Sequence, residues 1–197
     1  MKQELLGSLT SLADWIDIDR ENIASGNTLE LPHYAREIFK HMREKEKEFR
    51  LTSSPLVNHP ELSVHMRGVV VDWLVVLQDN YELNHETLYL AVRIMDSFLA
   101  NTKRRITKQM FQLVAATAIF VSAKLEERMP PPIDELLYAC DNSYTAQELV
   151  EMELDICRAT EFNFNMPLSY SFLRRYAKVS YSNCFALLSN LVYFLVF

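Results

Sequence analysis

An apolar stretch from Met110 to Leu125 dominates the pattern of the chain, and no charged residue interrupts it before Lys124. Apolar and small residues fill nearly every position instead of one stripe, which predicts a helix buried on all sides. The stretch is short for a membrane span, and its alanines favour close packing between helices over contact with lipid. The proline run 130–132 ends it. We therefore expect a central helix with other helices packed around it.

Helical spacing of apolar residues predicts further helices on both sides of this stretch. The first begins near Pro32, which suits a first helical turn. It is narrowly amphipathic, because Tyr34, Ile38, Phe39 and Met42 form one stripe and the other positions are mostly charged. The remaining helices are expected at 64–81, 85–99, 133–140, 145–160 and 168–178.

Residues at the expected helix starts suit N-caps. Ser63, Asn84 and Thr107 each precede a helix and carry a side-chain oxygen that can accept from the first free N–H groups. Thr145 and Glu148 have the T-x-x-E spacing of a capping box. These signals fix where four of the helices should begin.

Glycine is rare in the chain, with three in 197 residues. Sheet folds need many turn glycines, so the scarcity favours an all-α protein, and it leaves no glycine-rich loop for a phosphate. Gly68 lies in the middle of the helix expected at 64–81, where glycine costs about 1 kcal/mol relative to alanine. We therefore expect another element to pack closely against it.

Charge and side-chain chemistry exclude several function classes. The net charge of −6 disfavours a protein that holds nucleic acid through its phosphates. The three cysteines lack the C-x-x-C spacing of a zinc site or a disulfide framework. The five histidines are scattered with no nucleophile–base spacing, so we expect neither an enzyme nor a cofactor.

The two ends of the chain are less informative. Residues 14–19 alternate acidic and apolar side chains, which is compatible with a solvated arm or with a short linear motif for a partner. Residues 179–197 carry no charge. This segment could be a membrane tail anchor or the first part of a second buried core. We favour the buried core and therefore expect no membrane contact.

Four motifs in order carry a resemblance to a known family: MRGVVVDWL, ETLYLAV, VSAKLEE and MELDICRAT. Their order and spacing resemble a cyclin box, and ELNHETLYLAV with PLSYSFLRRYAK is similar to the B-three branch of the mitotic B-type cyclins. The resemblance implies an all-α fold: a five-helix box around the central helix, preceded by an amphipathic helix. It divides the chain into an arm (1–31), the box with its preceding helix (32–166), and a linker with the start of a truncated second repeat (167–197).

The resemblance also implies roles for single residues. Lys124 and Glu153 match the pair through which cyclins contact their kinase, although an ordinary intrachain salt bridge is the simpler alternative. Apolar contacts to the kinase are implied for Phe162, Tyr34 and Ile38. A second, structural pair inside the box is implied for Arg67 and Asp96.

A docking patch for substrates or inhibitors with an R-x-L motif is the third implied feature. Its matching positions are Met66, Val69, Val70, Trp73 and Gln112, with ordinary core packing as the alternative for Trp73. Two departures predict weaker or altered docking. Gly68 replaces the usual alanine, and Val76 stands where an acidic or amide residue commonly pairs with the arginine of the motif.

The function implied by the resemblance is that of a regulatory, non-catalytic subunit. It would bind and activate a cyclin-dependent kinase in mitotic or meiotic control, in the nucleus or also in the cytoplasm. Two alternatives stay open: a truncated isoform that fails to activate or inhibits the kinase, and a cyclin-fold transcription-factor adaptor. The acidic charge speaks against the second alternative.

Overall fold

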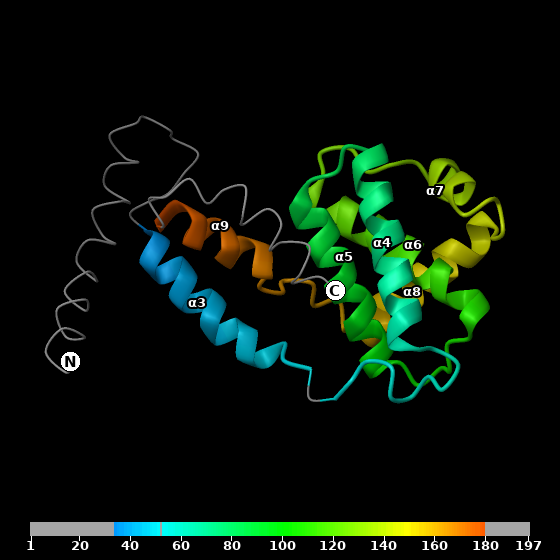
Figure 1. Cartoon of the computed structure of the whole chain (residues 1–197), viewed down its shortest axis with the longest axis horizontal. Helices are drawn as coiled ribbons and strands as arrows, with labels where there is room; N and C mark the ends of the chain where they lie inside the picture. Colours follow the sequence, from blue (N-terminus) through cyan, green and yellow to red (C-terminus); the bar gives the residue numbers. More distant parts are fainter. Residues whose placement is uncertain (1–33, 52, 180–197) are drawn as a thin grey trace, which may run out of the picture.

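The computed structural model describes residues 34–51 and 53–179, and within these residues every regular element is an α-helix (Figure 1). The all-α prediction is confirmed. The helices, in chain order, are α3 (Ala35–Glu48), α4 (Val64–Asn80), α5 (His85–Asn101), α6 (Lys108–Glu126), α7 (Ile133–Ala139), α8 (Ala146–Ala159) and α9 (Ser169–Val179).

Helix α6 is the centre of the fold. Its buried run includes Phe111 and extends without a break from Leu113 to Ala123. Helices α4, α5 and α8 all contact α6, and the contact with α5 is the most extensive. The expectation of a central helix surrounded by others is confirmed, because a side chain at any position of an all-apolar helix needs a neighbour to exclude water.

Two of the predicted caps form and two do not. The Ser63 hydroxyl accepts from the Met66 N–H at 3.2 Å, and Thr145 and Glu148 form the full capping box. Asn84 and Thr107 occupy N-cap positions, but neither side chain caps its helix. For these two residues the prediction of a side-chain cap is wrong.

Helices α3 and α9 lie side by side, next to the bundle formed by α4, α5, α6 and α8 (Figure 1). The rings of Phe39 on α3 and Phe172 on α9 are 6.0 Å apart. Helix α9 in turn packs on α5, where the Tyr170 ring lies 5.5 Å from that of Tyr89. At the other end of α3, the Arg93 guanidinium donates to the Phe49 carbonyl at 2.9 Å.

Gly68 does not mark a close packing site. A Cβ added to it would meet no heavy atom within 4 Å, so the expectation drawn from its position in the helix is wrong. A mid-helix glycine indicates close approach only where a neighbouring element lies over that face, and here none does.

No helix in the described part of the chain is long and apolar enough to cross a membrane. The arm 1–31 and nearly all of the uncharged segment 179–197 lie outside the described residues. For both segments, the two alternative interpretations drawn from the sequence therefore remain open.

Candidate partner-binding site

Arg67 and Asp96 form an ion pair between α4 and α5. The Arg67 guanidinium donates two hydrogen bonds, from Nε at 2.9 Å and from Nη2 at 2.8 Å, one to each carboxylate oxygen of Asp96. The side chains are only 18% and 11% exposed, respectively. The hydrogen bonds to Asp96 are the main cause that raises the pKa of Arg67 above its ordinary value, and burial opposes them. The predicted structural pair is confirmed.

Lys124 and Glu153 form a second pair, between the last turn of α6 and the middle of α8. The Lys124 ammonium donates to both carboxylate oxygens of Glu153, at 2.6 and 2.8 Å. It also lies 4.0 Å from the centre of the Phe120 ring, one turn earlier on α6. A cation in the last turn suits the negative end of the helix dipole. The Lys124 side chain is 39% exposed, so this pair lies at the rim of the fold.

Exposed apolar residues adjoin the Lys124–Glu153 pair in sequence on both helices. Leu125 follows Lys124 and is 51% exposed, and Leu154 follows Glu153 and is 45% exposed. Val150, one turn before Leu154 on α8, is also exposed. A charged pair accompanied by exposed apolar side chains has the composition of a partner-binding surface more than of an ordinary solvated helix face.

Phe162 lies in a left-handed turn after α8. Glu161 and Phe162 both have left-handed backbones, with φ of 53° and 56°. For a residue with a side chain this conformation costs roughly 1–2 kcal/mol. The Phe162 N–H donates to the Cys157 carbonyl at 2.9 Å, which stabilises the turn, and the ring remains 67% exposed. Left-handed residues also follow α4 and α7, so the exposed ring, and not the turn, makes Phe162 a candidate contact.

Tyr34 and Ile38, the other two predicted kinase contacts, belong to a different region. They lie at and near the start of α3 and are 62% and 42% exposed. Figure 1 shows α3 beside α9 and apart from α6 and α8. The structure thus brings together Lys124 and Glu153, and places Phe162 at the end of the same helix as Glu153, while Tyr34 and Ile38 form a separate exposed patch.

The predicted docking residues of α4 lie along one side of that helix, at spacings of three and four. Met66, Val70 and Trp73 are half-buried and pack against the core, whereas Val69 is 57% exposed. Val76 continues the row and is 50% exposed. The half-buried state of Trp73 fits core packing and a surface groove equally well.

Gln112, the fifth predicted docking residue, lies on α6 instead of α4. It is half-buried and lines a cavity of about 520 Å³ that is bounded by α8 and by the turn before it. Met110 and Tyr144 line the same cavity, and none of the docking residues of α4 does. The structure therefore forms a row on α4 and does not by itself join Gln112 to it.

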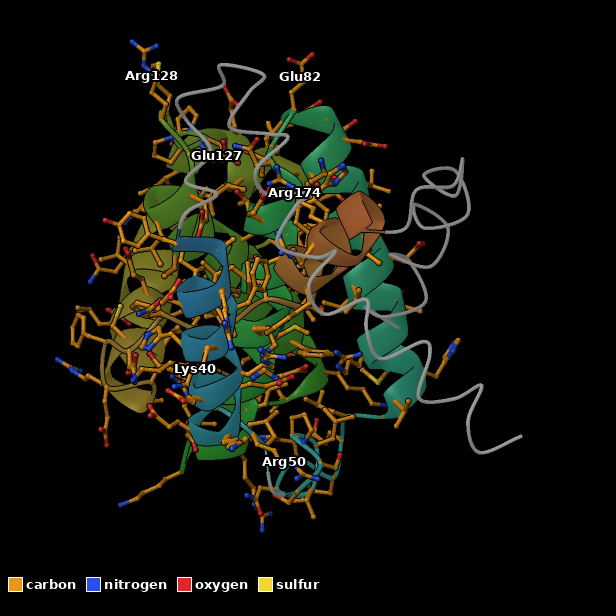
Figure 2. The ribbon with its side chains drawn as sticks, turned by 90° about the vertical axis from the view of Figure 1, so that its left-hand side faces the viewer. Lys40, Arg50, Glu82, Glu127, Arg128 and Arg174 are labelled. Atoms are coloured by element: carbon orange, nitrogen blue, oxygen red, sulfur yellow. The ribbon has the colours of Figure 1, made fainter. Side chains whose placement is uncertain are left out.

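Two residues that organise this region were not found from the sequence. The Glu127 carboxylate accepts from the backbone N–H and the side-chain amide of Asn84, both at 2.7 Å, and from the Thr87 hydroxyl. It thereby caps the Asn84 N–H at the start of α5, at the end of the molecule where Glu82 lies (Figure 2). For the neighbouring Glu126, burial is the main cause of a raised pKa, and the charges of Glu86 and Glu127 add to it.

The second such residue is His59, whose side chain is fully buried. Its Nδ1 accepts from the Ile106 N–H at 3.1 Å, so its Nε2 carries the proton that is donated to the Leu99 carbonyl at 2.9 Å. His59 therefore ties the loop before α4 to both ends of the α5–α6 connection. Its sequence neighbours gave no sign of these partners, which lie 40 and 47 residues away.

The described residues hold no group of three or more histidine, cysteine or carboxylate side chains that could bind a metal ion. Cys140 and Cys157 are buried free thiols, and burial is the main cause that raises the pKa of the Cys140 thiol to about 11. Cys184 lies outside the described residues.

Comparison with known proteins identifies the family. The family model of the cyclin N-terminal domain matches residues 37–165, which is most of the described chain. The chain belongs to the cyclin family. This cyclin is 44% identical over 162 residues to the G2/mitotic-specific cyclin-B3 of Gallus gallus, an alignment that covers 82% of the chain and 39% of the relative. It is 42% identical over 166 residues to that of Drosophila melanogaster, covering 82% and 27%.

These identities support the B3 branch of the B-type cyclins. The chain spans 39% or less of the length of both relatives. Among solved structures, a viral cyclin from herpesvirus saimiri matches with a TM-score of 0.63 at 24% identity, covering 70% of this chain and 59% of that one, which shows the cyclin fold.

Proposed function

We propose that this cyclin binds and activates a cyclin-dependent kinase, and that the Lys124–Glu153 pair is at the centre of the contact. The observation that carries the proposal is the position of that pair. It joins two helices at the rim of the fold, it is partly exposed, and exposed leucines follow both of its members in sequence.

The chemistry of the pair suits a protein partner. Charge-assisted hydrogen bonds are stronger than neutral ones, and both groups have capacity left: the ammonium has a third proton, and the carboxylate has further lone pairs. Phe162 would add an aromatic anchor. Binding would select the active conformer of the kinase by contacting it better than the inactive one.

The test is capture of cyclin-dependent kinases from a cell lysate by the whole chain, measured by quantitative mass spectrometry. Lys124→Ala and Glu153→Ala should each lower the captured amount by well over tenfold, since truncating one member of a desolvated charge pair costs about 2–5 kcal/mol. Arg174→Ala is the control, because Arg174 forms an interhelical ion pair of similar length with Glu86, at 2.8 Å between α9 and α5, and is more exposed than Lys124.

Normal capture by both variants, with unchanged circular dichroism, would mean that the pair is purely structural. Phosphorylation of a generic substrate by the captured kinase then separates an activating subunit from one that binds without activating. A gel shift with duplex DNA addresses the remaining alternative, the transcription-factor adaptor. We also propose a nuclear or shared nuclear and cytoplasmic location, on the strength of the family alone, to be checked by imaging a tagged chain.

Docking of R-x-L peptides is a second proposed activity, favoured by the row of half-exposed apolar residues on α4. Because Val76 offers no charge to the arginine of the motif, docking should rest on apolar contact, and Trp73→Ala should abolish it. Val76→Glu should strengthen binding in fluorescence anisotropy by supplying an ion pair. Val64→Glu, at an exposed position at the start of α4, is the control. Unchanged affinity in both Trp73→Ala and Val76→Glu would remove the docking proposal.

A further inference from the structure

An open polar cavity of about 950 Å³ lies where the ends of three helices meet. The residues that line it come from the end of α3 and the loop after it, the end of α5 with its following loop, and the end of α8. Neither the proposed kinase-contacting residues nor the row on α4 lines it. Its size is in the range of cavities that hold ligands, roughly 300–1,000 Å³.

Three positively charged side chains without a partner line this cavity. They are Arg50, Lys103 and Arg158, and each comes from a different one of the three regions. Among the described residues no hydrogen bond or ion pair involves any of them. Three segments that are far apart in the sequence thus each contribute an unpaired cation to the lining of this cavity.

The carboxylates of the same cavity are mostly neutralised. Asp155 pairs with Arg104 at 3.2 Å, and Glu48 pairs with Lys45 at 2.7 Å. Glu161 is the one lining carboxylate with no cation paired to it in the described part of the chain. The unpaired charges therefore leave the cavity positive, within a chain whose net charge is −6.

A simpler explanation for cations at this place is that they stabilise the negative ends of helix dipoles. Cations near a helix C-terminus are favourable, and Arg158 lies in the last turn of α8. That interaction acts through space and uses no N–H donor. No hydrogen bond from the side chain of Arg50, Lys103 or Arg158 forms within the described residues. Their donors remain available to a ligand.

The basic character continues along α3. Cations recur from the first turn of the helix to Arg50 at spacings of four and three residues, and all are exposed. With 3.6 residues per turn they form one stripe, about half a turn from the side that carries Tyr34 and Ile38. Figure 2 shows Lys40 on α3 and Arg50 beyond its end. The stripe consists of Arg36, Lys40, Arg43, Lys47 and Arg50.

We propose that the cavity and the α3 stripe together bind an acidic stretch of a partner protein. Its carboxylates would meet Arg50, Lys103 and Arg158 in the cavity, and its chain would continue along α3. Charge complementarity is the basis of the proposal, because the unpaired cations at both sites offer many donors and outnumber Glu161, the one unpaired carboxylate of the cavity. The surface lies on the opposite side of α3 from Tyr34 and Ile38, so the proposal does not depend on the kinase contact.

The test measures binding of a fluorescent peptide of alternating Glu and Ser to the whole chain at physiological salt, with a Gln–Ser peptide as the uncharged probe. The Glu–Ser peptide should bind and the Gln–Ser peptide should not. The double variant Arg50→Glu/Arg158→Glu should weaken binding by about tenfold or more, because two charge-assisted contacts become repulsive.

The control is Lys108→Glu/Arg128→Glu, which changes the net charge equally at two exposed positions outside the cavity. It should change the affinity by less than about threefold at this salt concentration, because separated surface charges are screened. Circular dichroism checks the fold, and Arg50→Gln/Arg158→Gln replaces the reversed variant if that variant unfolds.

Three results would overturn the proposal. Equal losses in the two double variants would show an effect of overall charge, and equal binding of both peptides would show that carboxylates are not recognised. Tighter binding of a single-stranded oligonucleotide or of phosphatidylserine vesicles, lost in Arg50→Glu/Arg158→Glu, would assign the surface to a different class of partner.

Discussion

Two of the interhelical ion pairs, Arg67–Asp96 and Lys124–Glu153, are similar in length and differ in their access to water. Both have a shortest N–O distance below 3 Å, but the cation is 18% exposed in the first and 39% exposed in the second. A largely buried pair has no spare access for a partner, and its role is to fix α4 against α5. The Lys124–Glu153 pair also holds two helices together, but its exposed atoms can still contact a partner.

Breaking the inner pair should have the largest effect on stability. Asp96→Ala leaves the Arg67 guanidinium largely buried without its carboxylate, and removing one member of such a pair typically costs about 3–5 kcal/mol. Urea unfolding followed by circular dichroism measures the loss.

Glu153→Ala is the matched change at the outer pair. Water can solvate Lys124 after the loss of Glu153, so the expected cost is less than about 1 kcal/mol. Equal losses at the two pairs would contradict the comparison, and Lys124–Glu153 would then have to be regarded as structural.

A smaller effect of opposite sign is expected next to the inner pair. Gly68→Ala should raise the free energy of unfolding by about 0.5–1 kcal/mol, because alanine loses less backbone entropy and its Cβ meets no atom within 4 Å. The same urea titration measures it. If Gly68→Ala instead lowers the free energy of unfolding, α4 tolerates no added atom next to Arg67. The stability lost in Asp96→Ala could then not be assigned to the ion pair alone.

Local pattern was sufficient for the helices but not for all of their ends. The buried run of α6 and the capping box of Thr145 and Glu148 are readable from residues within one or two turns. The cap of α5 is not, because Glu127 reaches Asn84 from 43 residues away. Gly68 was misread for the same reason, since the space around a residue is a property of the packed fold.

The candidate site was predictable mainly through the family motifs. Those motifs identified both ion pairs, and the structure supplied what the motifs cannot, which is their exposure. The left-handed turn that presents Phe162 has no glycine or asparagine at its two positive-φ residues, so sequence gave no signal for it. The convergence of Arg50, Lys103 and Arg158 depends on how three helices end in space, which periodicity along one helix does not specify.

The Glu127 cap has a consequence for the order of folding. A cap from a residue next to the helix can form as soon as the first turn nucleates. The Glu127 cap can form only after α5, the following loop and α6 have folded and brought Glu127 back to Asn84. Closing so long a loop carries an entropic cost that a local cap avoids. The first turn of α5 should therefore fray in the denatured ensemble and in early intermediates, and become fixed only when the α5–α6 hairpin is complete.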